Sequence, residues 1–203
     1  MNVLYDPFPQ TVSIDGREYR IVTDFREWIR LHSLVRDDTV PTEYKIRLLM
    51  QWYIDPPADI GKGIKALGDF LRAEEATGVS LPDKEKTDAA TPDKGASAGD
   101  HDTENIPAFS YEEDAACIFC AFMECYGIDL ESVRYMHWWK FRILFEGLNE
   151  ETEIKQRIRY RLMDLSTIKD KEERKRIKKI KRAIALKTEQ KPVDDFEIGD
   201  VFS

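Results

Sequence analysis

The sequence predicts a mainly α protein, a compact bundle of about seven helices with a small N-terminal β-hairpin. Apolar residues recur at helical spacing in seven segments of the chain. One of these segments, residues 129–147, is apolar on several sides, as expected for a helix buried against several neighbours. Strand-like alternation occurs beside Asp15-Gly16 near the N-terminus, a pair that favours a two-residue hairpin turn.

The composition is that of a globular protein, with 42% apolar and 34% charged residues among 203. No apolar run approaches the roughly 20 residues that span a bilayer. The N-terminus lacks the basic start and apolar stretch of a signal peptide. We therefore expect a cytoplasmic protein that makes no membrane contact.

The first 76 residues are expected to contain the hairpin and three helices. The hairpin pairs residues 12–14 with residues 19–21, and Thr23 or Asp24 caps the first helix. The second helix spans 41–53, and the third begins at about Asp59. Their expected inward residues are Phe25, Trp28, Ile29, His32 and Val35 in the first, Tyr44, Leu48, Leu49 and Trp52 in the second, and Ile60, Ile64, Leu67 and Leu71 in the third.

Residues 77–109 lose apolar periodicity and are rich in Pro, Asp, Thr, Ala and Gly, which predicts a flexible linker. Residues 110–187 are expected to form four more helices that pack on the first half as one body. Residues 188–203 are predicted to be an acidic disordered tail, which we expect to contact the basic helix before it transiently.

Each of the four later helices has an expected start or a buried face. Ser110 should cap the first, which ends at Gly127, and the second runs from Asp129 to Gly147 with Trp138 and Phe141 buried. The third, residues 150–164, should bury Ile154, Ile158, Leu162 and Leu165, with Lys155, Arg157 and Arg159 outward. Asp170 and Glu173 resemble a capping box for the last, which extends to about residue 186.

No motif predicts catalysis, a metal site or a cofactor site, so an enzyme is not expected. His32 and His137 lie on apolar faces and are interpreted as structural histidines. Cys117, Cys120 and Cys125 have no second Cys or His pair at zinc-binding spacing, so they are expected to be small buried thiols.

The last helix has a second interpretation because it is strongly basic. Residues 151–191 contain 15 Lys/Arg against 7 Asp/Glu, although the chain as a whole carries −8. Residues 169–187 could bind nucleic acid through phosphates, or dock Ile177, Ile180 and Ile184 on a protein. The second alternative is favoured, because aromatic residues are not interleaved and the rest of the chain would repel a polyanion.

Several motifs together resemble one known family, the gp-fifteen proteins encoded in the tail gene clusters of long-tailed bacterial viruses. They span most of the chain outside the linker and tail, and the most specific is His137-Trp138-Trp139-Lys140-Phe141-Arg142. The others are Leu4-Tyr5-Asp6-Pro7-Phe8-Pro9, Asp15-Gly16, Thr23-Asp24-Phe25-Arg26-Glu27-Trp28-Ile29, Tyr126-Gly127-Ile128-Asp129-Leu130, Leu144-Phe145-Glu146-Gly147-Leu148, Met163-Asp164-Leu165-Ser166 and Ile168-Lys169-Asp170-Lys171-Glu172-Glu173-Arg174.

The resemblance implies a non-catalytic tail assembly chaperone that binds the tape-measure protein or another tail protein. It would act in the host cytoplasm and be absent from the mature virion. Two alternatives remain open: a structural tail or connector component of the virion, and a nucleic-acid-binding accessory acting through the basic helix. Self-association is also compatible with the sequence.

The partner surface expected from the sequence has two parts, each with a surplus of large apolar residues. One is a groove along the second and third helices and the edge of the central helix: Tyr44, Trp52, Ile64, Leu71 and Trp139. The other is the isoleucine stripe of the last helix, residues 177, 180 and 184. The alternative for the groove residues is internal packing.

Overall fold

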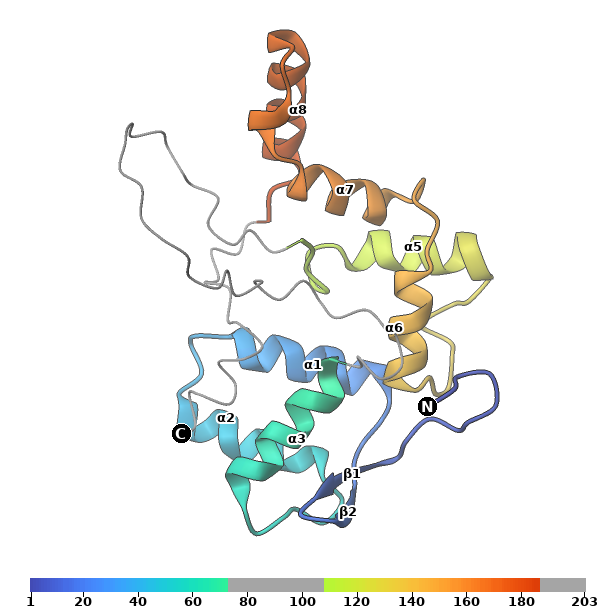
Figure 1. The fold of residues 1–203 in the computed structure, drawn as a ribbon, viewed down its shortest axis with the longest axis vertical. Coiled ribbons are helices and arrows are strands. Elements are labelled where there is room, and N and C mark those ends of the chain that lie inside the picture. The colour runs from blue at the N-terminus through green and yellow to red at the C-terminus, as the bar shows by residue number, and fades with distance from the viewer. Residues whose placement is uncertain (73–107, 187–203) are drawn as a thin grey trace, which may run out of the picture.

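The computed structural model describes residues 1–72 and 108–186. In this part of the chain it has seven α-helices and a two-stranded antiparallel sheet, which confirms the predicted fold class (Figure 1). The helices are α1 (Phe25–Arg36), α2 (Thr42–Leu49), α3 (Ile60–Arg72), α5 (Ala115–Tyr126), α6 (Trp138–Glu146), α7 (Glu153–Leu162) and α8 (Lys171–Ala183), with 3-10 turns η1 (Met50–Trp52) and η2 (Leu165–Thr167). The tail at 188–203 and the linker, except residues 108 and 109, lie outside the described residues.

The hairpin forms where the sequence predicts it, from β1 (Thr11–Ile14) and β2 (Arg17–Arg20). Asp15 and Gly16 have φ values of 51° and 78°, as the tight turn between right-twisted strands requires. The inner face of β1 is buried, and the strand packs on α3. This helix supplies the apolar surface without which a lone hairpin is marginal.

α1 and α6 begin side by side, although more than 100 residues separate them in the sequence. The Phe25 N–H donates to the Met136 carbonyl at 2.9 Å, and the Trp138 N–H donates to the Thr23 carbonyl at 2.8 Å. Asp24 caps α1 as predicted, because its carboxylate accepts from the Arg26 N–H. These backbone bonds join the two described segments at the starts of two helices.

α6 is shorter than the predicted helix at 129–147, and the prediction is wrong for residues 129–137. His137 caps α6, with its Nδ1 accepting the Trp139 N–H at 3.1 Å. The residues just before it pair with the chain ahead of α1 and are extended. Val133 and Met136 are apolar because they pack on the core from the non-helical segment before α6.

The aromatic residues of α6 form the centre of the molecule, as the sequence predicts. Trp138 and Phe141 are 0% and 1% exposed. Trp138 stacks on Trp28 of α1, and Phe141 lies between Phe25 of α1 and Phe122 of α5, with ring centroids 4.8 and 5.1 Å away. Buried residues from both described segments form one core around these rings.

α2 and α3 differ from prediction in which residues face inward. Tyr44 and Ile60 are 59% and 47% exposed, because each lies in the first turn of a helix that packs through its later turns. Gly63 allows α3 to approach the chain that follows α2. A Cβ added there would lie 2.8 Å from Pro57 Cγ, closer than packed atoms allow.

α5 starts five residues after its predicted cap. The hydroxyl of Ser110 accepts from the N–H groups of Glu112 and Glu113, so it caps the turn before the helix. Gly127 ends α5 with φ 62°, in the left-handed conformation expected of a C-terminal glycine.

α7 and α8 complete the chain, with α8 at one end of the molecule and the hairpin at the other (Figure 1). Asp170 caps α8 as predicted, accepting from the N–H groups of Glu172 and Glu173. Leu162, predicted to be buried, is 58% exposed because α7 ends there and turns toward η2. Across residues 1–72 and 108–186, no helix has the length and apolarity needed to cross a bilayer.

Candidate partner-binding surfaces

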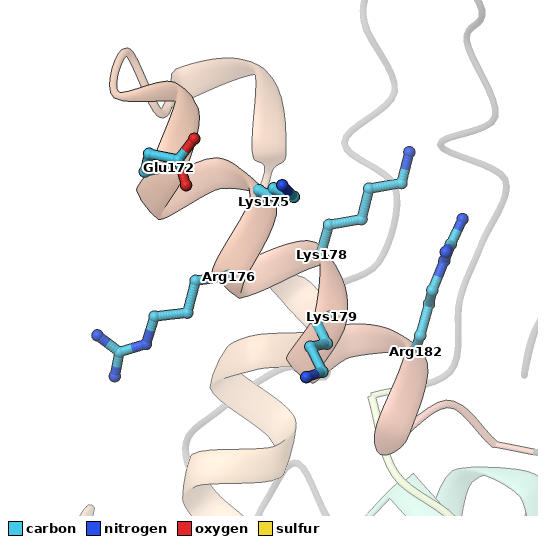
Figure 2. Close-up of a pocket in the computed structure, with 6 residues that line it drawn as sticks. All are labelled: Glu172, Lys175, Arg176, Lys178, Lys179 and Arg182. Atoms are coloured by element: carbon cyan, nitrogen blue, oxygen red, sulfur yellow. The ribbon is translucent and has the colours of Figure 1, made fainter.

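The outer face of α8 is a strongly basic surface. The helix contains eight Lys/Arg and two Asp/Glu in 13 residues, a net charge of +6. Figure 2 shows six exposed side chains of this helix that line one shallow hollow. We call them the basic face: Glu172, Lys175, Arg176, Lys178, Lys179 and Arg182.

The opposite side of α8 holds the helix on the body. Ile177 is 6% exposed, and α8 packs against α7 and η2. Lys181 donates from Nζ to the Met163 carbonyl at 2.8 Å. Arg161 of α7 donates from Nε to the carbonyl of Ile184, just after α8, at 2.8 Å. These contacts fix one side of the helix and leave the basic face outward.

Arg161 also belongs to a buried ionic cluster that the sequence analysis missed. Its Nη1 and Nη2 donate to the two carboxylate oxygens of Asp114 at 2.6 and 2.9 Å, and Arg157 contacts the same carboxylate at 3.1 Å. Asp114 is 0% exposed. Burial alone would raise its pKa, but the hydrogen bonds from Arg161 and the Ser110 N–H hold the pKa below its ordinary value.

A sequence signal for this cluster existed. Arg161 falls on the same side of α7 as Ile154 and Ile158, so an arginine occupies a mostly buried stripe. Such an arginine needs an acidic partner. The sequence analysis instead expected Arg157 to point outward and named no acidic partner for Arg161.

α5 presents a second surface, which the sequence analysis also missed. Only one of its 12 residues, Glu124, is charged, and α6 and α7 cover two of its sides. Four residues on the remaining side are exposed at helical spacing; we call them the α5 apolar face: Ala116, Phe119, Cys120 and Met123. Phe119 and Met123 are 36% and 44% exposed. The sequence signal available was that this helix is apolar on all sides, including the side that α6 and α7 leave uncovered.

The residues predicted from sequence to bind a partner do not form one exposed groove. Ile64, Leu71 and Trp139 are 2%, 4% and 4% exposed and belong to the core, where Trp139 Nε1 donates to the Phe70 carbonyl. Tyr44 is exposed on α2, and Trp52 is half-buried.

The isoleucine stripe of α8 lies on the side that holds the helix to the body. Ile177 is buried, and Ile180 and Ile184 are half-buried. The five groove residues and these three isoleucines make up the eight predicted partner-binding residues, and their role stays a prediction. The structure nevertheless shows that burial leaves four of them, residues 64, 71, 139 and 177, little surface to offer.

The histidines and cysteines of the described segments have structural surroundings. His137 Nε2 lies 2.9 Å from the Pro9 carbonyl, and burial lowers its pKa. Burial, with the nearby charges of Arg36 and Arg142, lowers the pKa of His32 to about 3. Cys117 is buried, whereas Cys120 is exposed, which corrects the expectation of three buried thiols. Within residues 1–72 and 108–186, no group of His, Cys, Asp and Glu has the arrangement of a metal site.

Comparison with known proteins identifies the family. The family model described as Bacteriophage Gp15 protein matches residues 4–186, which confirms the resemblance seen in the sequence motifs. The chain matches no curated protein and no solved structure. The family is not known as enzymatic, and it supports a structural or morphogenetic role in a phage. With a match over nearly its whole length, the chain belongs to the bacteriophage Gp15 protein family.

Proposed function

We propose that this protein is a tail assembly chaperone that binds the phage tape-measure protein during tail morphogenesis. The observation that carries the proposal is the family match over residues 4–186, which supports a structural or morphogenetic phage protein. The role is one of holding a partner, without catalysis. It would be exercised in the host cytoplasm, and the protein would leave the tail before the virion is complete.

The α5 apolar face supports a holding role. Exposed apolar residues at helical spacing can pack against the apolar stripe of a second helix. A tape-measure protein is long and helical, and its apolar stripes must be kept from aggregating until the tail tube forms around it. Met123 and Phe119 suit such a client, because a flexible thioether beside an aromatic ring adapts to irregular surfaces.

The construction of the body also supports the proposal. α5 packs on α6 and α7, and α6 is fixed to α1 through aromatic stacking and backbone hydrogen bonds. The apolar face therefore lies on a helix that the core holds in place. Docking on a preorganised surface costs less conformational entropy than docking on a segment that must first become ordered.

Co-expression with the tape-measure protein of the same phage tests the proposal. We expect the tape-measure protein to be soluble and to co-purify with this chain, and to aggregate when expressed alone. An unrelated helical protein of similar size serves as the control for a general effect of co-expression. If the tape-measure protein is equally insoluble with and without this chain, the proposal is wrong.

Mass spectrometry of purified virions separates a chaperone from a structural component. A chaperone should be absent, or present far below the copy number of the tail subunits. Stoichiometric recovery of this chain from particles would instead identify a tail or connector component.

A further inference from the structure

The basic side chains of α8 are concentrated on one helix, with eight Lys/Arg against two Asp/Glu in 13 residues. Elsewhere, some basic residues pair with carboxylates within the body, as in Arg30–Glu27, Lys62–Asp15 and Arg157–Asp114. Across residues 1–72 and 108–186, no ion pair joins a Lys or Arg of α8 to a carboxylate. Asp164 offsets part of this positive charge, because hydrogen bonds from Ser166 and then the charges of Lys181 and Arg174 lower its pKa. The residues of the basic face form no ion pair with the rest of the described body.

This arrangement brings like charges together on adjacent turns of one helix. Arg174, Lys178 and Arg182 follow one another at intervals of four residues, as do Lys171, Lys175 and Lys179. Like charges at this spacing destabilise a helix. An acidic ligand that contacted several of these groups at once would relieve the repulsion between them. The basic face therefore has the charge complementarity that favours an anionic partner.

The body presents this face and does not cover it. Ile177, Lys181 and the carbonyl of Ile184 are engaged on the inner side of α8, and Asp170 fixes its start. Lys175, Lys178 and Arg182 are exposed and line the hollow in Figure 2. A ligand can thus reach the basic face without disturbing the contacts that hold the helix.

The chemistry of the face favours a polypeptide over a nucleic acid. Glu172 lies among the basic residues, where it would repel a phosphate but could pair with a basic residue of an acidic peptide. The face has no aromatic side chain for base stacking and no Asn, Gln, Ser or Thr for base or phosphate contacts. The chain outside α8 is strongly acidic, since the total of −8 includes the +6 of this helix, and would repel a long polyanion.

We propose that the basic face of α8 is a docking surface for an acidic segment of another polypeptide, with several carboxylates within two helical turns. The proposal does not depend on the tape-measure protein being the client, because the face is separate from the α5 apolar face and recognises charge. Lys175, Lys178 and Arg182 are its central contacts, since they lie at spacings of three and four residues on one side of the helix.

Fluorescence anisotropy with the full chain tests the proposal. The probe is a labelled 12-residue peptide of alternating Glu and Ala at low salt, and a peptide with Gln in place of Glu is its control. A duplex of about 12 base pairs is the competing ligand class. We expect the Glu peptide to bind, the Gln peptide not to bind, and the duplex to bind more weakly than the Glu peptide.

Two charge-reversal variants with the same change in net charge locate the binding. K175E/K178E/R182E should weaken binding of the Glu peptide about tenfold or more. K65E/R134E/K140E alters exposed residues outside α8 and should retain affinity within about twofold. Circular dichroism should show unchanged helix content in both reversal variants, because Glu is a good helix former. K175Q/K178Q/R182Q checks that peptide binding is lost when the positive charges are removed and no negative charge is added.

Three results would overturn the proposal. Equal weakening in both reversal variants would mean that net charge, and not the basic face, attracts the peptide. Tighter binding of the duplex, lost in K175E/K178E/R182E, would assign the face to nucleic acid. Binding that appears only after D194N/D195N/E197Q would mean that the chain's own acidic tail is the occupant.

Discussion

The carboxylate of Asp114 and the guanidinium of Arg161 form a two-point ion pair inside the protein, with oxygen–nitrogen distances of 2.6 and 2.9 Å. The pair joins the start of α5 to α7. Arg161 also donates to the carbonyls of Ala108 and Ile184, so one side chain connects four parts of the second described segment. The positions of both candidate surfaces therefore depend on this arginine.

Arg161→Met should destabilise the protein by about 3 kcal/mol, because it leaves the buried Asp114 carboxylate short of a partner. Replacing both residues, Asp114→Leu with Arg161→Met, should cost less than the single change, since no buried charge is left unpaired. Denaturant unfolding of the two variants gives the comparison. A double variant less stable than Arg161→Met would show that the pair is a net source of stability.

The same variant should loosen α8. Arg161→Met removes the hydrogen bond to the Ile184 carbonyl, so amide hydrogen exchange in residues 177–184 should become faster. Exchange in α1, which makes no contact with this arginine among the described residues, serves as the internal reference. Unchanged exchange at the end of α8 would mean that its other contacts suffice to hold it.

Trp138→Ala should remove about 3–5 kcal/mol of stability, because the side chain is fully buried and its Nε1 donates to the Leu71 carbonyl at 2.9 Å. Lys178→Ala, on the exposed basic face, should change stability by less than about 0.5 kcal/mol. Lys181→Ala should cost more than Lys178→Ala, because Lys181 donates to the Met163 carbonyl. Thermal unfolding of the three variants measures the order.

Two glycines of α3 should respond oppositely to alanine. Gly63→Ala should destabilise the protein, because the new methyl group would lie 2.8 Å from the Pro57 ring. Gly68→Ala should stabilise it by up to about 1 kcal/mol, since no atom lies within 4 Å of the added Cβ and alanine favours the helix. Chemical denaturation compares them. Stabilisation by both changes would show that α3 can shift away from Pro57 without loss.

His32 should make stability depend on pH between neutrality and about pH 3. Its pKa is lowered from 6.5 to about 3 in the folded protein, so the unfolded chain binds a proton first as the pH falls. Its contribution to stability is fully present above pH 6.5 and is lost as the pH falls toward 3. His32→Asn should therefore lose less stability between pH 7 and pH 5 than the wild type. Equal losses in denaturant unfolding would contradict this.

Local patterns in the sequence were sufficient to predict most elements of the fold. Asp15-Gly16 has the turn geometry that fixes the hairpin, and Asp24, Asp170 and Gly127 cap helices through contacts only a few residues long. The burial of Trp138 and Phe141 followed from apolar residues on several sides of one segment. These features depend on neighbours in the sequence or on a single helical period, so they are readable without the fold.

Features that depend on distant contacts could not be read in the same way. Residues 129–137 are not helical, because a turn closes at Val133 and residues 136 and 137 then pair with the chain ahead of α1, more than 100 positions earlier. Asp114 meets Arg161 across a separation of 47 residues. Apolar pattern identifies buried residues but not the neighbour that covers them, so Trp139 was assigned to a partner surface and the exposed side of α5 was overlooked.

The most direct test of the holding role is co-expression of the tape-measure protein with F119S/M123S, scored by the soluble fraction of the tape-measure protein. Both residues are exposed, so the variant should fold as the wild type does, and I54S/L162S changes equally apolar, exposed residues elsewhere as the control. Phe119 and Met123 would be buried in the complex, so replacing both should weaken binding of the tape-measure protein by about 2 kcal/mol or more. We predict that F119S/M123S fails to keep the tape-measure protein soluble while I54S/L162S succeeds; equal solubility with both variants would contradict the account.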